Sequence, residues 1–192
     1  MKIVNWLRKF KAAQFFACLV LFFSFSIATI ANAANDIASV RRYRHQEVYG
    51  QVVHVSDGDT LILQTAQGEK FKLRLYAIDA PEKAQPYGPQ STGILRNLIG
   101  NKYIRSYVED IDRYGRMVAR VYYDRQDINA EMVRLGAAWH YKAYDKSGSY
   151  QKYADLELFA RNNHKGLWNR ENPLPPWEYR RLIRAQHQAR SY

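Results

Sequence analysis

The stretch Ser56-Asp57-Gly58-Asp59-Thr60 (SDGDT) lies between the alternating run of residues 51–55 (QVVHV) and the apolar run of residues 61–63 (LIL). Asp-Gly between two strand-like runs is a strong short-range signal for a β-hairpin, because glycine readily takes the positive φ of a tight turn. Two aspartates this close together allow a second interpretation, in which they are held at a site. The residues on either side decide between these interpretations.

The chain on both sides of this turn is mainly strand-like. Short alternating or apolar runs recur, with Gly, Asp or charged breaks between them. The five predicted strands are Val48–Val55, Thr60–Gln64, Phe71–Ala77, Tyr103–Val108 and Met117–Tyr123. Five short strands in one domain favour a small barrel over an open sheet.

Helical patterns fill the gap between the third and fourth strands and most of the C-terminal part. In residues 87–99 apolar side chains recur at helical spacing, and Gly100 follows as a stop signal. Asn129 is the predicted N-cap of a second helix that ends at Gly136. A third helix is predicted over Tyr150–Asn163. The predicted fold class is therefore α+β, mainly a five-stranded β barrel, with three helices.

The N-terminal segment has the pattern of a secretory signal peptide. A basic head precedes an uncharged, mostly apolar stretch from Ala12 to Ile30, and Ala31-Asn32-Ala33 has the small-x-small form of a cleavage site. Export to the periplasm or the medium, with cleavage near Ala33, is the favoured prediction. A retained membrane anchor stays open, because a 19-residue apolar stretch nearly spans a bilayer. Membrane association is expected only in that second case.

The mature chain would hold 159 of the 192 residues, about one domain, and we expect a monomer. The predicted parts are a signal peptide (1–33), a linker (34–45), the barrel domain (46–170), and a Pro-rich break with a basic tail (171–192). The tail is predicted to be helical over Trp177–Arg190. It either adds phosphate contacts or is a solvated terminal helix, and the second interpretation is favoured.

Charge and cysteine content narrow the function classes. The formal net charge of +11 falls to +7 once the four basic residues of the head are removed, and all 15 tyrosines lie in the mature part. A basic, aromatic-rich surface suits nucleic acid, since cations neutralise phosphates and rings stack on bases. Solubility or contact with an anionic envelope explains the charge equally well. The only cysteine, Cys18, lies in the apolar segment, which excludes disulfides and cysteine chemistry from the mature chain.

Acidic residues flank the ends of predicted strands in two stretches, SDGDT and AIDAPE: Asp57, Asp59, Asp79 and Glu82. Single carboxylates at such points usually cap turns, but two stretches brought together by a barrel suit a hard cation such as Ca²⁺. Arg74 in the third strand and Arg116 before the fifth add planar donors that match phosphate oxygens. Acids together with arginines indicate phosphoryl chemistry.

Six motifs carry a resemblance to a known family. They are VSDGDT (55–60), LRLYAIDAPE (73–82), YGPQS (87–91), DRYGRMVA (112–119), INAEMVRLGAA (128–138) and ARNNHKGLW (160–168). In this order and approximate spacing they resemble the staphylococcal nuclease (thermonuclease) family, from about Val48 to Trp168. The resemblance implies an OB-fold barrel of five strands with three helices, in agreement with the pattern of strands and helices.

The resemblance also implies roles for the acidic residues. Asp59 and Asp79 resemble the two aspartates that bind Ca²⁺, with the backbone carbonyl of Ala80 as a further ligand. Asp57 and Thr60 would sit close by in supporting roles. Ala80 stands where the type member of the family has threonine, which leaves a carbonyl ligand unchanged.

The remaining matched residues face the substrate in the family. Glu82 resembles the glutamate that acts as general base for the attacking water or as its orienter. Arg74 and Arg116 resemble the pair that holds the scissile phosphate and stabilises its transition state. Tyr114 matches a tyrosine that helps to bind the nucleotide.

Two departures from the type member affect these implied roles. The segment from Glu82 to Tyr87 is shorter than its mobile loop, which leaves open how the glutamate is positioned. Lys142 falls where the type member has a base-stacking tyrosine, so Tyr141 and Tyr144 are the candidate substitutes for substrate binding.

The implied function is that of an exported, Ca²⁺-dependent endonuclease. It would be a phosphodiester hydrolase that cleaves DNA and RNA with low sequence specificity and leaves 3′-phosphate ends. A non-catalytic nucleic-acid-binding OB module is the alternative, and a basic envelope-associated structural protein is a third interpretation. The enzyme is favoured, because a binding module has no use for Glu82 beside a metal.

Overall fold

The computed structural model describes residues 38–146, 148 and 150–190 of the chain. The predicted signal peptide, its cleavage site and the first part of the linker lie outside the described residues. Within these ranges, no helix is both long and apolar enough to cross a bilayer. The chain divides into the units Met1–Arg42 and Tyr43–Tyr192, and the second holds every element described below.

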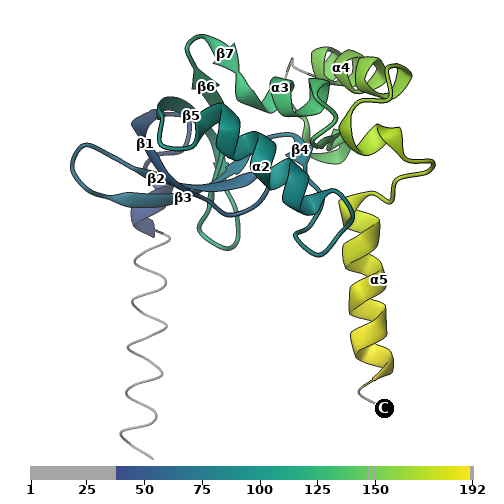
Figure 1. Cartoon of the computed structure of the whole chain (residues 1–192). Helices are drawn as coiled ribbons and strands as arrows, with labels where there is room; N and C mark the ends of the chain where they lie inside the picture. The colour runs from purple at the N-terminus through teal and green to yellow at the C-terminus, as the bar shows by residue number, and fades with distance from the viewer. Residues whose placement is uncertain (1–37, 147, 149, 191–192) are drawn as a thin grey trace, which may run out of the picture. The chain divides into compact units, whose positions relative to one another are not determined.

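Five strands form a closed barrel (Figure 1). They are β1 (Glu47–Val55), β2 (Thr60–Gln64), β3 (Lys70–Leu75), β5 (Tyr103–Ile111) and β6 (Met117–Tyr123). Neighbours pair in the order β3-β2-β1-β5-β6, and a parallel pairing of β3 with β6 closes the sheet. The predicted five-stranded barrel is confirmed, because the apolar residues of each run alternate into one shared core.

The barrel core consists of aliphatic side chains from every strand. Val52, Leu61, Leu63, Leu73, Leu75, Ile104, Val108, Met117, Ala119 and Val121 are at most 1% exposed. Helix α2 (Gly88–Ile99) adds Leu95 and Ile99, which are both fully buried. Burial of this aliphatic surface supplies the main driving force for the fold.

Two short strands form a separate sheet outside the barrel, and one of them begins where the third strand was predicted to end. The predicted strand ran to Ala77, but β3 ends at Leu75 because Ala77 has a φ of 58° and turns the chain. The next two residues form β4 (Ile78–Asp79), which pairs with β8 (Trp139–His140). A further two-residue strand, β7 (Gln126–Asp127), pairs with the end of β6.

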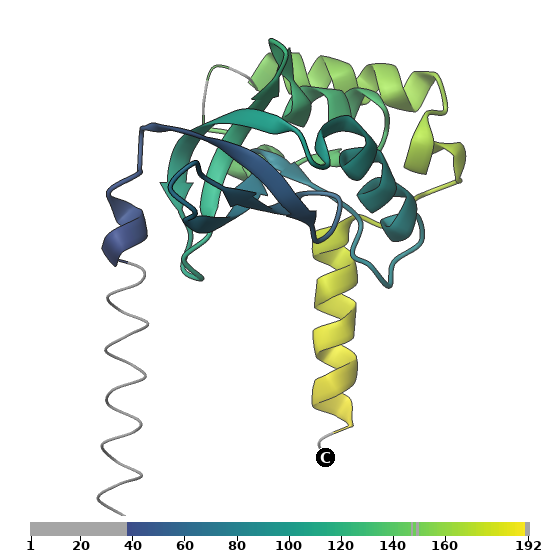
Figure 2. The same ribbon diagram turned by 60° about the vertical axis from the view of Figure 1, so that its left-hand side comes forward.

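The described part of the unit from Tyr43 onward also contains four α-helices, close to the positions predicted from the sequence. Besides α2 they are α3 (Ile128–Arg134), α4 (Tyr150–Asn162) and α5 (Pro176–Ala189), with 3-10 turns η1 (Lys142–Tyr144) and η2 (Gly166–Asn169). Helices α3 and α4 lie side by side, and most of α5 projects away from the barrel (Figures 1 and 2).

The predicted N-cap of α3 is wrong. Asp127 caps the helix by accepting from the N–H of Ala130, whereas Asn129 lies within the helix and is fully buried. The Asn129 amide accepts from the N–H of Val121 and donates to the Tyr76 carbonyl. A side chain predicted to cap a helix therefore ties α3 to the barrel wall.

Candidate active site

The SDGDT turn joins β1 to β2 and holds two of the predicted site residues. The N–H groups of Ser56 and Asp57 donate to the Thr60 carbonyl over 2.8 and 3.3 Å. Asp57 Oδ1 accepts from the N–H of Asp59 over 3.0 Å. The short loop is thus fixed by its own hydrogen bonds, as the hairpin signal predicted.

Packing space, and not the positive φ suggested by the sequence, requires glycine at position 58. Gly58 does not have a positive φ. A Cβ at this position would overlap Ser91 Oγ of α2 and lie 2.7 Å from the Ala80 Cβ. The missing side chain therefore lets α2 and the segment after β4 pack directly against the turn.

Asp59 is 4% exposed and is held by three donors. Its Oδ1 accepts from Thr60 Oγ1 at 2.9 Å and from Arg74 Nη1 at 2.7 Å, and its Oδ2 accepts from the Ala80 N–H at 3.0 Å. Burial works against the charged form, but Arg74 and these hydrogen bonds outweigh it and lower the pKa of Asp59. Asp59 is therefore a carboxylate at neutral pH.

Arg74 joins this aspartate to Asp79. It lies on β3 opposite Thr60 of β2, and its Nη2 donates to Asp79 Oδ1 over 2.7 Å. Asp79 is fully buried on β4, where it pairs with Trp139 of β8. One guanidinium thus holds both predicted Ca²⁺ ligands, which lie 20 positions apart in the chain.

Glu82 follows Asp79 by three residues and is bound by an arginine from the C-terminal helix. Arg180 Nη1 donates to Glu82 Oε1 over 2.7 Å and to Asp79 Oδ1 over 3.2 Å. Its Nη2 donates to Asp79 Oδ2 over 2.7 Å. The structure therefore brings the predicted acids Asp59, Asp79 and Glu82 into one cluster with two arginines.

Sequence reasoning missed Arg180. The tail that contains it was predicted to be a solvated helix, and three other arginines of the same tail look equivalent in composition. A weak signal was available in Trp177, which precedes Arg180 by three residues and so lies on the same helix face. An aromatic anchor on a basic tail indicates that one face of the helix packs on the domain.

Arg116 and Tyr114 lie in the turn between β5 and β6, without a hydrogen bond to the acids among the described contacts. The Arg116 Nε donates to Asp112 Oδ2 over 2.7 Å. In the parallel β3–β6 pair Leu73 and Met117 lie opposite each other in the core. Arg116 directly precedes Met117 and Arg74 directly follows Leu73, so the alternation of side chains predicts that both arginines project outward from this pair of strands.

The predicted substrate-binding tyrosines differ in their surroundings. Tyr114 is 67% exposed and Tyr144 is 60% exposed. Tyr141 instead stacks on Trp177 of α5 with the ring centroids 5.3 Å apart and the planes 2° from parallel. Tyr114 and Tyr144 are thus largely exposed, although the Arg116 guanidinium lies 5.5 Å from the Tyr114 ring centroid and the Tyr144 ring lies 4.5 Å from that of Tyr141.

The acidic cluster carries more negative charge than its arginines neutralise. Asp57 is part of it, and burial together with the charge of Asp59 raises the pKa of Asp57 to about 6. Burial likewise raises the pKa of Asp79, against the opposing effect of Arg180 and Arg74. With all four carboxylates ionised, the two arginines leave a formal charge of −2, which one divalent cation would neutralise.

The donor set fits a hard cation in its chemistry. Carboxylates and backbone carbonyls are the oxygen ligands that Ca²⁺ takes. Across residues 38–146, 148 and 150–190, no three acidic, histidine or cysteine side chains converge on one point as they stand. The reason is that arginine nitrogens lie between the carboxylates, so a bound cation would have to share oxygens with them or displace them.

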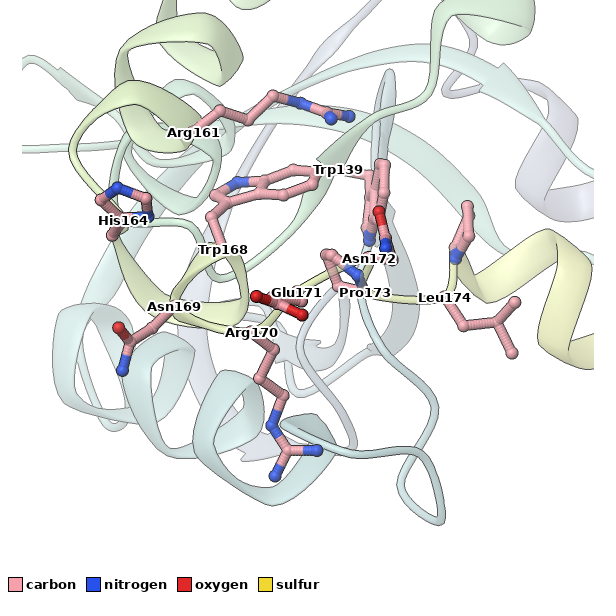
Figure 3. A pocket seen from close by; sticks show the side chains of 11 residues that line it. Trp139, Arg161, His164, Trp168, Asn169, Arg170, Glu171, Asn172, Pro173 and Leu174 are labelled. Carbon is pink, nitrogen blue, oxygen red and sulfur yellow. The ribbon is translucent and has the colours of Figure 1, made fainter.

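A cavity of about 780 Å³ lies away from this cluster (Figure 3). Trp139, Trp168 and Arg161 line it together with residues 169–175, and the Arg161 guanidinium lies 3.8 Å from the Trp168 ring centroid. None of the four clustered acids is among its lining residues. The acids themselves therefore do not line this cavity, although Trp139 of its wall pairs with Asp79, and Glu82 is the acid of the cluster that is exposed to solvent at 41% of its side chain.

Comparison with known proteins gives consistent matches. The family described as "Staphylococcal nuclease homologue" matches residues 72–170. An "Uncharacterized endonuclease" of Haemophilus influenzae is 42% identical over 131 residues, which cover 68% of this chain and 72% of that protein. An "Uncharacterized endonuclease" of Escherichia coli O157:H7 is 39% identical over 135 residues, or 70% of this chain and 86% of that protein.

A plant protein matches over a smaller share of its length. The "Probable staphylococcal-like nuclease CAN1" of Oryza sativa is 37% identical over 158 residues, which cover 79% of this chain but 47% of that protein. The family match ends at residue 170, before α5 begins. Arg180 therefore lies outside the segment that the family description covers.

Proposed function

The chain belongs to the staphylococcal nuclease family, and on this basis we propose that it is an endonuclease acting on DNA and RNA with low sequence specificity. The observation that carries the proposal is the cluster of Asp59, Asp79 and Glu82 around the Arg74 guanidinium. A phosphodiester is anionic and repels nucleophiles, so its hydrolysis needs cationic groups and a base at one place. This cluster supplies both.

Ca²⁺ is the proposed cofactor. Asp59, Asp79 and the backbone carbonyl of Ala80 would hold it, with Asp57 and Thr60 fixing the turn beside it. When bound, the cation supplies positive charge that polarises the phosphate. The two aspartates are already oriented by donors from Arg74 and the Ala80 N–H, so little reorganisation of their backbone is needed.

Glu82 is proposed to orient the attacking water and to accept its proton. Its side chain is 41% exposed, so water reaches it from solvent. As the water oxygen bonds to phosphorus, the bond from phosphorus to the 5′-oxygen breaks. The departing oxygen takes a proton from solvent, and the 3′-phosphate stays on the other fragment.

Arg116 and Arg74 are proposed to bind the scissile phosphate, because both are predicted to project outward from the β3–β6 pair. Arg116 is paired with Asp112 in the unliganded protein and would exchange this partner for phosphate oxygens. Tyr114 and Tyr144 are exposed and would stack on bases without strong sequence preference. Tyr141 already contacts the rings of Trp177 and Tyr144, so it would contribute by supporting Tyr144.

A cleavage assay tests this proposal. The purified mature protein is incubated with single-stranded DNA, duplex DNA and RNA, each with Ca²⁺ or with chelator, and fragment ends are analysed. We expect cleavage of all three substrates with Ca²⁺, 3′-phosphate ends, and none with chelator. Tight binding without cleavage would instead favour the non-catalytic OB module, and chelator-resistant cleavage would remove the metal claim alone.

Export after cleavage near Ala33 is a separate proposal. It is supported by the basic head, the apolar stretch and the Ala-Asn-Ala site in the sequence. N-terminal sequencing of the protein from the periplasm or the medium should give a chain beginning at Ala34 or within a few residues of it. An intact N-terminus in the membrane fraction would favour the anchor instead.

A further inference from the structure

The C-terminal helix contributes a side chain to the acidic cluster from outside the segment matched by the family. From its contacts we infer that Arg180 is a positioning residue, which holds the Glu82 carboxylate in place for the reaction. This inference rests on the proposed nuclease function. It assigns to α5 a part in the active site, in place of the solvated tail expected from the sequence.

The Arg180 guanidinium links a buried acid to a partly exposed one. Two of its three bonds go to Asp79, whose side chain is fully buried, and they fix the guanidinium plane. The third goes to Oε1 of Glu82, whose side chain is 41% exposed. A planar two-pronged donor transmits orientation as well as charge, which a lysine cannot do. The bonded oxygen is one of two, so the other can face water.

A second contact ties the Glu82 backbone to the same segment. Gln85 is 4% exposed and accepts from the Glu82 N–H over 3.2 Å through its Oε1. Its Nε2 donates to the carbonyl of Leu174, two residues before α5. The short loop after Asp79 is thus held at its backbone and at its carboxylate by one C-terminal segment.

Helix α5 is itself anchored where Arg180 needs it. Trp177 stacks on Tyr141 and lies edge-on to Trp139 at a centroid distance of 5.6 Å. Trp139 belongs to β8 and pairs with Asp79 of β4, and Tyr141 directly follows that strand. Trp177 and Arg180 are three residues apart and share a helix face. The same packing therefore fixes the arginine relative to its buried acceptor.

This arrangement explains how a short loop can keep a general base in place. Turn hydrogen bonds from the Gln85 N–H to the Glu82 carbonyl and from the Gly88 N–H to the Gln85 carbonyl fix the backbone of this segment, and Arg180 of α5 adds the contact that fixes the Glu82 carboxylate. An opposite role is conceivable for such an arginine, in which it blocks the acids and slows the reaction. The two roles predict opposite effects when Arg180 is replaced.

The test compares kcat and KM for four proteins at saturating Ca²⁺: the wild type, Arg180→Gln, Arg180→Lys and Arg181→Gln. Arg181 is the matched control, because it is 71% exposed at the side chain and pairs with Glu178 of its own helix. We expect Arg180→Gln to lower kcat about tenfold to a hundredfold with little change in KM, as misplacement of a catalytic group does. Arg180→Lys should recover part of the loss, and Arg181→Gln should match the wild type.

An unchanged or raised kcat in Arg180→Gln would overturn the inference, and a raised kcat would identify an inhibitory contact. A second comparison asks whether Arg180 acts through Glu82. In a Glu82→Ala background, Arg180→Gln should cause no further loss of kcat. A full additional loss there would overturn the assignment, because Arg180 would then act on something else.

Urea unfolding of the wild type, Glu82→Ala, Arg180→Gln and the double variant tests the contact without an activity measurement. We expect the changes in unfolding free energy for Glu82→Ala and Arg180→Gln to be non-additive, because the two side chains share a hydrogen bond. Additive changes would overturn the contact in solution. If the wild type cleaves nothing, the proposed function fails, and this cycle alone decides whether Arg180 holds Glu82.

Discussion

Each of two arginines bridges a pair of carboxylates in the acidic cluster and offsets their charge. Arg74 bonds to both Asp59 and Asp79 at 2.7 Å, and without it these buried carboxylates would repel each other. Arg180 does the same for Asp79 and Glu82. Each guanidinium offsets the negative charge of two neighbouring carboxylates, so that the cluster presents oriented groups of both signs to one phosphate.

Arg116 should be required for turnover even though it does not touch the acids in the unliganded protein. We expect Arg116→Gln to lower kcat about a hundredfold, the scale for losing one oriented donor to the transition state. Steady-state kinetics on single-stranded DNA measure it. Arg96→Gln on α2 is the charge-matched control, because Arg96 is exposed and lies outside the six motifs that carry the proposed site residues. Near-normal turnover of Arg116→Gln would remove its assigned role.

Gly58 should be intolerant of a side chain for steric reasons. We expect Gly58→Ala to lower the free energy of unfolding by about 1–3 kcal/mol, the usual penalty for overpacking, because its Cβ would overlap Ser91 and Ala80. Gly93→Ala is the control: nothing lies within 4 Å of its Cβ, and alanine favours a helix by about 1 kcal/mol. Urea titration compares the two variants. A neutral Gly58→Ala would contradict the packing argument.

At the scale of elements, the pairing of β4 with β8 places Asp79. The chain turns at Ala77, and the next two residues leave the barrel order to pair with Trp139 and His140. Hydrophobic alternation alone cannot show such a turn, because the apolar run from Leu75 to Ile78 continues through it. The predicted strand was therefore too long at its end, although the strand itself was correct.

The parts that sequence predicted well are those with strong local patterns. Helices α2 and α4 were predicted to within one residue at each end, since apolar spacing and stop signals mark them. The motif residues Asp59, Asp79 and Glu82 were predicted together and lie together. Arg180 was not, because its role arises from a contact 98 positions away in the chain, which no local pattern contains.

Strand β8 also carries a buried histidine that makes stability depend on pH. His140 Nε2 lies 3.0 Å from Asp145 Oδ2, and its Nδ1 is buried without a hydrogen-bond partner among the described residues. Burial lowers the pKa of His140, and Asp145 opposes this effect only in part. A second proton on the ring would therefore be left unsatisfied in the folded state.

The sign of this effect follows from linkage. With its pKa depressed on folding, His140 contributes stability that is present above its unfolded pKa of about 6.5 and is lost as the pH falls through the folded value. We expect the unfolding free energy of His140→Gln to depend less on pH below about 6.5 than that of the wild type. His54→Gln, at an exposed position of β1, is the control and should keep the wild-type slope. Equal slopes in all three proteins would contradict this account.

For the molecule as a whole, charge governs how substrate arrives. The sequence carries 29 Lys and Arg residues against 18 Asp and Glu residues. A basic protein that neutralises phosphates releases counterions, so its affinity falls steeply with salt. We expect KM for single-stranded DNA to rise at least about tenfold between 50 and 200 mM NaCl, while kcat changes little. A KM independent of salt would contradict binding through phosphates.

The central claim is that the cluster of Asp59, Asp79, Glu82 and its arginines hydrolyses phosphodiester bonds. It is tested most directly by the single-turnover rate at which the wild type and Glu82→Gln cleave a labelled single-stranded DNA. The two proteins are prepared in parallel, and their thermal unfolding midpoints are first shown to be equal. The account predicts Ca²⁺-dependent cleavage by the wild type and a rate lowered about a hundredfold or more in Glu82→Gln. No cleavage by the wild type, or equal rates for both proteins, would contradict it.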